Sequence, residues 1–230
     1  MVETMRKEKD RFNPQEWDEI YLAFAESRVG AFFKGRALRA SGFYNLVADK
    51  DASILDVGCG TGRVLVEWSS QGFSRLYGVE PDAELTRKIP NGIHVATAAA
   101  QKLPFETGMF DVVFVYGVLH HIPMAGWPLA FAEMDRVLKP NGLLFILEPA
   151  ISTVYRLMWA VSKVAGVMRR RWGMMARAID LEREEIFPFM RNHGFFERHL
   201  RDLGYEFLVN RRTPFVSPIV HWFVTCRKTL

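Results

Sequence analysis

Residues 54–62 read Ile54-Leu55-Asp56-Val57-Gly58-Cys59-Gly60-Thr61-Gly62, a short apolar run that ends in a turn with three glycines. The apolar run predicts a buried strand, and the pattern after the turn predicts the start of a helix. Glycine allows backbone conformations with positive φ and lets a ligand approach closely, while the first amides of a helix are free to donate hydrogen bonds. The stretch therefore indicates a ligand-binding loop at the end of a strand.

From Ser53 onward, short apolar runs alternate with helical patterns. The expected strands are residues 54–57, 76–79, 93–96, 112–116, 143–147, 205–210 and 219–226, and the expected helices are residues 62–71, 127–138 and 195–203. The second of these helices ends at Lys139-Pro140-Asn141-Gly142, which is a stop signal. Alternation of this kind is typical of parallel strands joined by crossover helices, so the sequence predicts an α/β domain.

Two segments depart from the alternation. Apolar residues recur at helical spacing from Trp17, behind Asn13-Pro14, and further apolar positions continue to Leu46, which predicts a helical N-terminal lead-in. Aromatic and basic residues interleave from residue 150 to residue 190 and predict an inserted helical cap. We expect a single domain over residues 1–230, made of a lead-in (1–50), a core (51–149), the cap (150–190) and a final helix with strands (191–230).

Composition limits the partners and the environment. The chain has 30 Lys and Arg against 26 Asp and Glu, and the net charge of +4 is mildly basic and far from the dense basic stripe of a dedicated nucleic-acid binder, so composition alone names no partner. Cys59 and Cys226 lie far apart, which favours neither a disulfide framework nor a zinc site. No apolar run reaches the roughly 18 residues of a membrane span, and residues 1–10 lack an apolar signal segment. We expect a cytoplasmic protein.

Glycine spacing separates the candidate cofactors. A dinucleotide fingerprint requires Gly-x-Gly-x-x-Gly, whereas the glycines here fall at positions 58, 60 and 62, and Arg63 stands where the third is expected. The spacing therefore disfavours an oxidoreductase that binds a nicotinamide cofactor, which we keep as an alternative to be tested.

The stretch 54–62 closely resembles the first motif of class I S-adenosylmethionine-dependent methyltransferases. The resemblance covers about residues 50–149 and continues through Glu80, Leu103-Pro104-Phe105, Phe110-Asp111-Val112-Val113, Gly117-Val118-Leu119-His120-His121-Ile122, Glu133, Arg136-Val137-Leu138-Lys139-Pro140 and Asn141-Gly142. It implies a doubly wound, Rossmann-like sheet of seven mostly parallel strands with the last strand antiparallel. It also implies S-adenosylmethionine as the cofactor and methyl transfer as the activity.

The resemblance assigns roles in cofactor binding. Asp56 would orient the loop and the ammonium group of the cofactor, while the two carboxylate oxygens of Glu80 suit the two ribose hydroxyls. The family often carries an Asp that receives the adenine amino group, and Ala99 stands at that position. Adenine would then rely on the backbone at Ala100 and on Gln101. The other residues expected to bind the cofactor are Gly58, Cys59, Gly60, Gly62, Pro81 and Tyr116.

Catalysis requires little chemistry from the protein, because a sulfonium methyl group is already activated and the enzyme chiefly aligns the acceptor. A hydroxyl or ammonium acceptor would also lose a proton. His120, His121 and Glu148 lie near the carboxyl edge of the expected sheet, where ligands bind in open α/β folds. We favour His121 as the base, with His120 as the second candidate and loop packing as the alternative for both. A metal ion bound by His120 and His121 is disfavoured, because the sequence offers no third ligand at recognisable spacing.

The acceptor is expected to be a small molecule. Neither Asn/Asp/Ser-Pro-Pro-Tyr/Phe nor Pro-Cys follows the fourth expected strand, which argues against methyltransferases that act on DNA bases. Residues 151–177 favour an apolar or anionic acceptor, or a peripheral contact with a membrane surface, while a plain lid helix is the alternative. An RNA or protein methyltransferase and a non-catalytic binding module with the same fold stay open, and the sequence does not give the oligomeric state.

Overall fold

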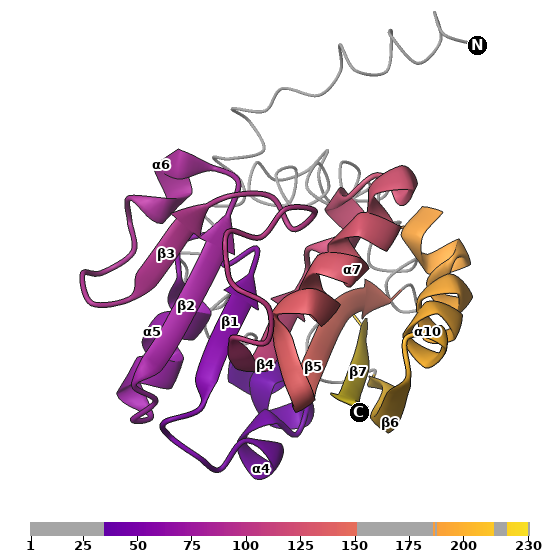
Figure 1. The fold of residues 1–230 in the computed structure, drawn as a ribbon, viewed down its shortest axis with the longest axis horizontal. Helices are drawn as coiled ribbons and strands as arrows, with labels where there is room; N and C mark the ends of the chain where they lie inside the picture. The colour runs from indigo at the N-terminus through magenta and orange to yellow at the C-terminus, as the bar shows by residue number, and fades with distance from the viewer. Residues whose placement is uncertain (1–34, 151–185, 187, 214–219, 230) are drawn as a thin grey trace, which may run out of the picture.

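The computed structural model describes residues 35–150, 186, 188–213 and 220–229. A seven-stranded sheet in the order β3-β2-β1-β4-β5-β7-β6 forms the centre of the molecule, with helices on both faces (Figure 1). Its strands are β1 (Ser53–Val57), β2 (Arg75–Glu80), β3 (His94–Thr97), β4 (Phe110–Tyr116), β5 (Leu138–Ala150), β6 (Tyr205–Thr213) and β7 (Val220–Lys228). The helices are α4 (Phe43–Leu46), α5 (Arg63–Ser70), α6 (Ala83–Thr86), α7 (Trp127–Val137) and α10 (His193–Asp202), with 3-10 turns η1 (Leu119–His121) and η2 (Met124–Gly126).

The strand pairing confirms the expected topology. Strands β1 to β5 pair in parallel, and β7 is antiparallel to both of its neighbours, β5 and β6. The chain runs outward from β1 to β3 and then returns to place β4 on the other side of β1. This reversal makes the carboxyl ends of β1 and β4 the switch point where open α/β sheets bind ligands.

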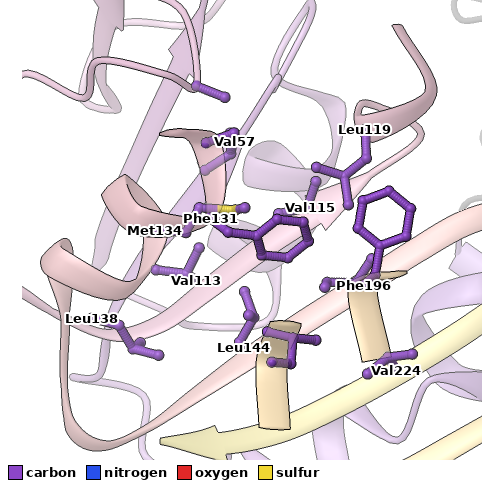
Figure 2. Close-up of a cluster of buried hydrophobic side chains, with 14 of the residues drawn as sticks. Val57, Val113, Val115, Leu119, Phe131, Met134, Leu138, Leu144, Phe196 and Val224 are labelled. Carbon is purple, nitrogen blue, oxygen red and sulfur yellow. The ribbon is translucent and has the colours of Figure 1, made fainter. Parts of the chain in front are cut away.

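Each face of the sheet buries its own hydrophobic cluster, because side chains alternate along the strands. Val113 and Val115 of β4 belong to one cluster, and Val112 and Phe114 belong to the other. Helices α7 and α10 cover the first cluster (Figure 1). Figure 2 shows this side, where Phe131 and Met134 from α7 and Phe196 from α10 pack toward Val113, Val115, Leu144 and Val224. The second cluster lies under α4 and α5.

An aromatic group anchors α4 and α5 to the sheet. The rings of Phe43 and Trp68 stack with their centroids 4.7 Å apart, and both rings meet Phe114 edge-on, at 5.9 Å and 5.0 Å. Phe43 and Trp68 are fully buried, and such pairs add about 0.5–1.5 kcal/mol beyond the burial of their area. The packing fixes α5, and with it the end of the glycine loop from which α5 starts.

The structure differs from the sequence expectation at the start of β5. Helix α7 ends at Val137, as the stop signal predicts, but β5 begins at Leu138 rather than at residue 143. Phe110 pairs with Leu138 and Val112 pairs with Leu143, so the register shifts between the two pairs. Asn141 takes up this irregularity with a φ of 63°. The pairing of β5 with β4 is therefore irregular where the turn-forming residues predicted a connection.

The ends of the expected lead-in and cap are only partly described. Residues 35–40 are helical and α4 follows them, which agrees with a helical lead-in that ends near Leu46. Residues 1–34 and almost all of the cap lie outside the described residues, and the division of the chain into these parts stays a prediction. Among the helices that the structure describes, none has the length and apolar character needed to cross a bilayer.

Candidate functional site

The glycine loop between β1 and α5 depends on three positive φ angles. Gly58, Gly60 and Gly62 have φ values of 71°, 55° and 72°. A Cβ atom on Gly58 would lie 2.3 Å from Cγ2 of Val118, so the loop passes directly against the segment after β4. The amide of Gly58 donates a hydrogen bond of 2.7 Å to the carbonyl of Val79, which ties the loop to β2. The loop is therefore held on both sides at the switch point of the sheet.

Cys59 points its side chain away from the surface of the loop. It is 5% exposed, and a Cβ atom on Gly78 of β2 would lie 2.8 Å from its Sγ. The side chain thus packs against β2, and the amide of Cys59 donates to the carbonyl of Val79 at 3.0 Å. Any contact of Cys59 with a cofactor is expected to use backbone atoms.

Glu80 joins the glycine loop to the start of α6. Its Oε2 accepts a 3.0 Å hydrogen bond from the amide of Gly60, and its Oε1 accepts a 3.2 Å hydrogen bond from the amide of Asp82. Burial raises the pKa of Glu80 above its usual 4.5, and the neighbouring carboxylate of Asp82 adds to the rise, while the two backbone hydrogen bonds and the proximity of His121 lower it in part. Each carboxylate oxygen has two lone pairs, so each keeps one for a further donor such as a ribose hydroxyl.

Three other expected residues lie at the carboxyl ends of the same strands. Asp56 is 3% exposed and stands between Gly78 of β2 and Phe114 of β4 in the sheet register. Pro81 is exposed directly after β2, and Tyr116 is half-buried at the end of β4 and packs toward the cluster under α4 and α5. The sheet thus brings Asp56, Pro81 and Tyr116 to the edge that carries the glycine loop.

The loop after β3 carries the residues expected near adenine. Ala99 is exposed and Ala100 is 7% exposed. Gln101 is half-buried and its side chain reaches η2. A Cβ atom placed on Gly126 of η2 would lie 3.0 Å from Nε2 of Gln101. Gln101 therefore connects the loop after β3 with the segment after β4, and its amide is a polar group two positions after Ala99.

Two charged residues of α7 hold this loop in place. The amide of Leu103 donates to Oε2 of Glu133 at 2.8 Å, and Arg136 donates to the carbonyls of Leu103 and Phe105 at 3.0 Å and 2.8 Å. Glu133 and Arg136 also pair with each other at 2.6 Å, and this hydrogen bond lowers the pKa of Glu133. Glu133 and Arg136 belong to the motifs that carry the family resemblance, but the sequence predicted no role for them. Their i, i+3 spacing was the signal that could have paired them.

The two histidines have different surroundings. His120 is 7% exposed, and its Nδ1 lies 2.7 Å from Oε2 of Glu148, which is fully buried. His121 is exposed, and its ring centroid lies 4.0 Å from that of His120. His120 is thus held in the interior, which supports the packing alternative for this residue, while His121 stands at the surface. Within the described part of the chain, no cluster of three or more potential metal ligands is found.

The central part of the chain is similar to known proteins. Residues 55–146 match the model of a family described as a methyltransferase domain. An uncharacterized protein from Haemophilus influenzae is 38% identical over 104 residues, which cover 41% of each chain. The ubiquinone/menaquinone biosynthesis C-methyltransferase UbiE from Campylobacter jejuni is 29% identical over 115 residues, which cover 45% of this chain and 47% of that protein. The match thus spans less than half the length of these relatives.

Solved structures share the fold at low sequence identity. The PH0226 protein from Pyrococcus horikoshii superposes with a TM-score of 0.63 at 17% identity, covering 92% of this chain and 99% of that one. A 1,6-didemethyltoxoflavin-N1-methyltransferase from Burkholderia thailandensis, crystallised with 1,6-didemethyltoxoflavin and S-adenosylhomocysteine, gives a TM-score of 0.54 at 16% identity, covering 95% and 92%. These likenesses extend the fold beyond the segment 55–146.

Proposed function

Because residues 55–146 match a family described as a methyltransferase domain, we propose that the chain transfers the methyl group of S-adenosylmethionine to a small-molecule acceptor. The observation that carries the proposal is the junction of the glycine loop with Glu80, whose carboxylate holds the amide of Gly60 at 3.0 Å. This junction puts a carboxylate and three glycines at the switch point of the sheet. The chain therefore has the parts needed to hold both a ribose and an amino-acid group.

The residues at this edge fit the parts of the cofactor. The methionine part of the cofactor would be held by Asp56, Gly58, Gly60 and Gly62, and the ribose by Glu80 and Pro81. The walls of the site would be formed by Ala100, Gln101 and Tyr116. The bound cofactor would supply a methyl group on a positively charged sulfur. The protein has to align the acceptor with that methyl group and exclude water, and alignment alone can supply about 7–11 kcal/mol of the barrier.

His121 is the proposed base for an acceptor that loses a proton. It is exposed, and it follows β4 at the carboxyl edge of the sheet. The hydrogen of an acceptor hydroxyl or ammonium would leave as a proton to the imidazole of His121, and exposure lets the ring pass that proton to solvent. His120 is the second candidate, and its bond with Glu148 at 2.7 Å favours a supporting role.

An apolar acceptor is the proposed substrate class. The names of the relatives describe a quinone methyltransferase and, at 30% identity over 112 residues, a sterol 4-C-methyltransferase from Caenorhabditis elegans. Residues 151–177 add aromatic and basic side chains, and a peripheral membrane contact through them stays a prediction from the sequence, as does a cytoplasmic location. A methyltransferase that acts on RNA or protein and a non-catalytic binding module are the alternatives.

Thermal unfolding with three ligands tests the cofactor. At about 100 times the dissociation constant a ligand adds about 2.7 kcal/mol, which for a chain of this size is a rise of about 5–10 °C in Tm. We expect this rise with S-adenosylmethionine and S-adenosylhomocysteine, a smaller one in Glu80→Ala, and none with NAD. A rise with NAD alone would support the oxidoreductase alternative and contradict the proposal.

Transfer of a labelled methyl group then separates the acceptor classes. The protein would be incubated with methyl-tritiated S-adenosylmethionine and a cell extract, followed by separation into solvent-extractable, RNA and protein fractions. Label in the solvent-extractable fraction supports an apolar small molecule. Label in RNA or protein would favour those alternatives, and binding without transfer to any fraction would favour the non-catalytic module.

A further inference from the structure

A fully buried carboxylate stands at the carboxyl end of β5, where it touches the segment after β4. We propose that Glu148 is a positioning residue that fixes this segment and thereby sets how tightly the glycine loop binds its ligand, an inference that rests on the proposed function. Glu148 would act through the residues 118–121 and not through contact with the cofactor.

Three donors from consecutive residues converge on this carboxylate. Its Oε1 accepts from the amides of Val118 and Leu119 at 2.9 Å and 2.8 Å, and its Oε2 lies 2.7 Å from Nδ1 of His120. A buried carboxylate is costly unless charge-assisted hydrogen bonds of this kind satisfy it. Since all three donors belong to one short segment, the carboxylate fixes the shape of that segment.

The same segment shapes the cofactor side of the site. The side chain of Val118 covers Gly58, because a Cβ atom on Gly58 would lie 2.3 Å from its Cγ2. The amide of Gly117 donates to the carbonyl of Leu147 at 2.8 Å, so two successive residues of β5 hold the segment. A displacement of the amides that Glu148 holds would move Val118 away from the glycine loop and loosen the turn around the ligand.

The carboxylate also determines which ring nitrogen of His120 carries a hydrogen. A carboxylate can only accept, so Nδ1 must donate, and a neutral ring then has its Nε2 free of hydrogen. The amide of His121 donates to the carbonyl of Val118 at 3.0 Å, and the two histidine rings are in contact at 4.0 Å. Glu148 therefore orders the segment that carries the proposed base as well as the cover of the glycine loop.

Asp111 offers a control carboxylate at the opposite end of the strands, with the same number of hydrogen bonds as Glu148 but a side chain that is 38% exposed. Its carboxylate accepts from the amide and the hydroxyl of Ser53 at 2.9 Å and 2.7 Å and from Lys139 at 2.8 Å. Asp111 is the second residue of β4, so it lies at the amino end, away from the glycine loop. Loss of this carboxylate removes as many hydrogen bonds as loss of Glu148 does, without touching the segment 118–121.

Calorimetric titration with S-adenosylhomocysteine tests whether Glu148 affects the affinity for the ligand. Measured where thermal unfolding shows each protein folded, Glu148→Ala should bind about tenfold more weakly or worse, and Asp111→Ala within about twofold of the wild type. Glu148→Gln should stay within about threefold, because its amide oxygen can still accept from Val118 and Leu119. Wild-type affinity in Glu148→Ala, or an equal loss in Asp111→Ala, would overturn the proposal.

The tautomer of His120 gives a readout that does not depend on ligand binding. Long-range proton–nitrogen spectra of the imidazoles, assigned with His120→Asn and His121→Asn, should show hydrogen on Nδ1 of His120 in the wild type. In Glu148→Gln the amide can donate to Nδ1, which should move the hydrogen to Nε2. Hydrogen on Nε2 in the wild type would contradict the proposal. If the wild type fails to bind S-adenosylhomocysteine, the proposed cofactor is wrong, while these spectra still test the role of Glu148.

Discussion

Gly58 is required for two reasons, its backbone conformation and the closeness of its neighbour. Its φ is 71°, and a Cβ atom there would lie 2.3 Å from Val118. The backbone strain alone costs about 1–2 kcal/mol for an L residue. We therefore expect Gly58→Ala to lower Tm and to weaken the binding of S-adenosylhomocysteine more than about tenfold, because the loop or Val118 must move.

Gly72 separates the two effects at Gly58. It also has a positive φ, of 90°, but no atom lies within 4 Å of the place where its Cβ would be. Gly72→Ala should therefore lower Tm by strain and leave the dissociation constant unchanged. Equal losses of affinity in the two variants would show that the contact with Val118 does not matter for binding.

A substitution at Ala99 should strengthen the binding of the cofactor. A carboxylate at this position would face the adenine amino group if the family resemblance holds, and hydrogen bonds to charged groups are worth about 1.5–3 kcal/mol. We expect Ala99→Asp to tighten S-adenosylhomocysteine binding by about tenfold, measured by calorimetry. Ala99→Asn, which is neutral, should gain less. Weaker binding in Ala99→Asp would mean that adenine lies elsewhere.

Glu80 should make ligand binding depend on pH. Burial raises the pKa of Glu80 above 4.5, so the group takes up a proton at a higher pH than an exposed carboxyl. A protonated Glu80 accepts less well from ribose hydroxyls. The affinity for S-adenosylhomocysteine should therefore fall as the pH is lowered from about 8 to about 5, and Glu80→Gln should bind weakly with a flatter profile. An unchanged wild-type profile would rule out Glu80 as the ribose acceptor.

At the scale of the elements, α7 carries the pair that holds the loop after β3. Arg136→Ala would remove the donors to the carbonyls of Leu103 and Phe105, at a cost of about 1–3 kcal/mol in the free energy of unfolding. We expect a lower denaturation midpoint and a loss of about threefold or more in ligand affinity, because the loop carries the residues proposed to lie near adenine. Denaturant unfolding and calorimetry measure the two effects.

Arg87 is the control for this prediction. It pairs with Glu84 at the same i, i+3 spacing, but the side chains are 70% and 73% exposed. Exposed pairs contribute little, so Arg87→Ala should leave both stability and affinity close to the wild type. A similar loss of stability and affinity in Arg87→Ala and Arg136→Ala would mean that removing a positive charge from a helix causes the loss. The contacts of Arg136 with the loop would then not be its cause.

Local sequence patterns predicted the elements well and predicted contacts between distant residues poorly. Every expected strand is present in the structure, since each is a compact apolar run, and α7 ends where its stop signal lies. The early start of β5 was missed because Leu138 joins the sheet by pairing with Phe110, which is distant in the chain. The bond between His120 and Glu148 was missed because it joins residues 28 positions apart and needs the register of β4 and β5.

At the scale of the whole molecule, the sheet separates two clusters that should behave independently. Phe43 lies on the side of α4 and Phe196 on the side of α10. Phe43→Leu and Phe196→Leu should each cost about 0.5–3 kcal/mol, and the double variant should equal their sum within about 0.5 kcal/mol. Denaturant unfolding of the single and double variants measures this.

A pair within one cluster gives the contrasting result. Phe43 and Trp68 stack at 4.7 Å, so Phe43→Leu combined with Trp68→Phe should deviate from additivity by about 0.5–1.5 kcal/mol. If the pair on opposite faces couples as strongly as the stacked pair, the two clusters do not act as separate units.

The position of β7 has a consequence for how the protein is made. β7 lies between β5 and β6, although it follows both in the chain. A ribosome releases β5 long before residues 220–228, and domains tend to fold as the chain emerges. During that interval the amides and carbonyls along the outer edge of β5 have no strand to pair with, which is a hazard for association with other chains. Completion of the sheet therefore waits for translation of its seventh strand, and a nascent chain stalled before that point should be a substrate for chaperones.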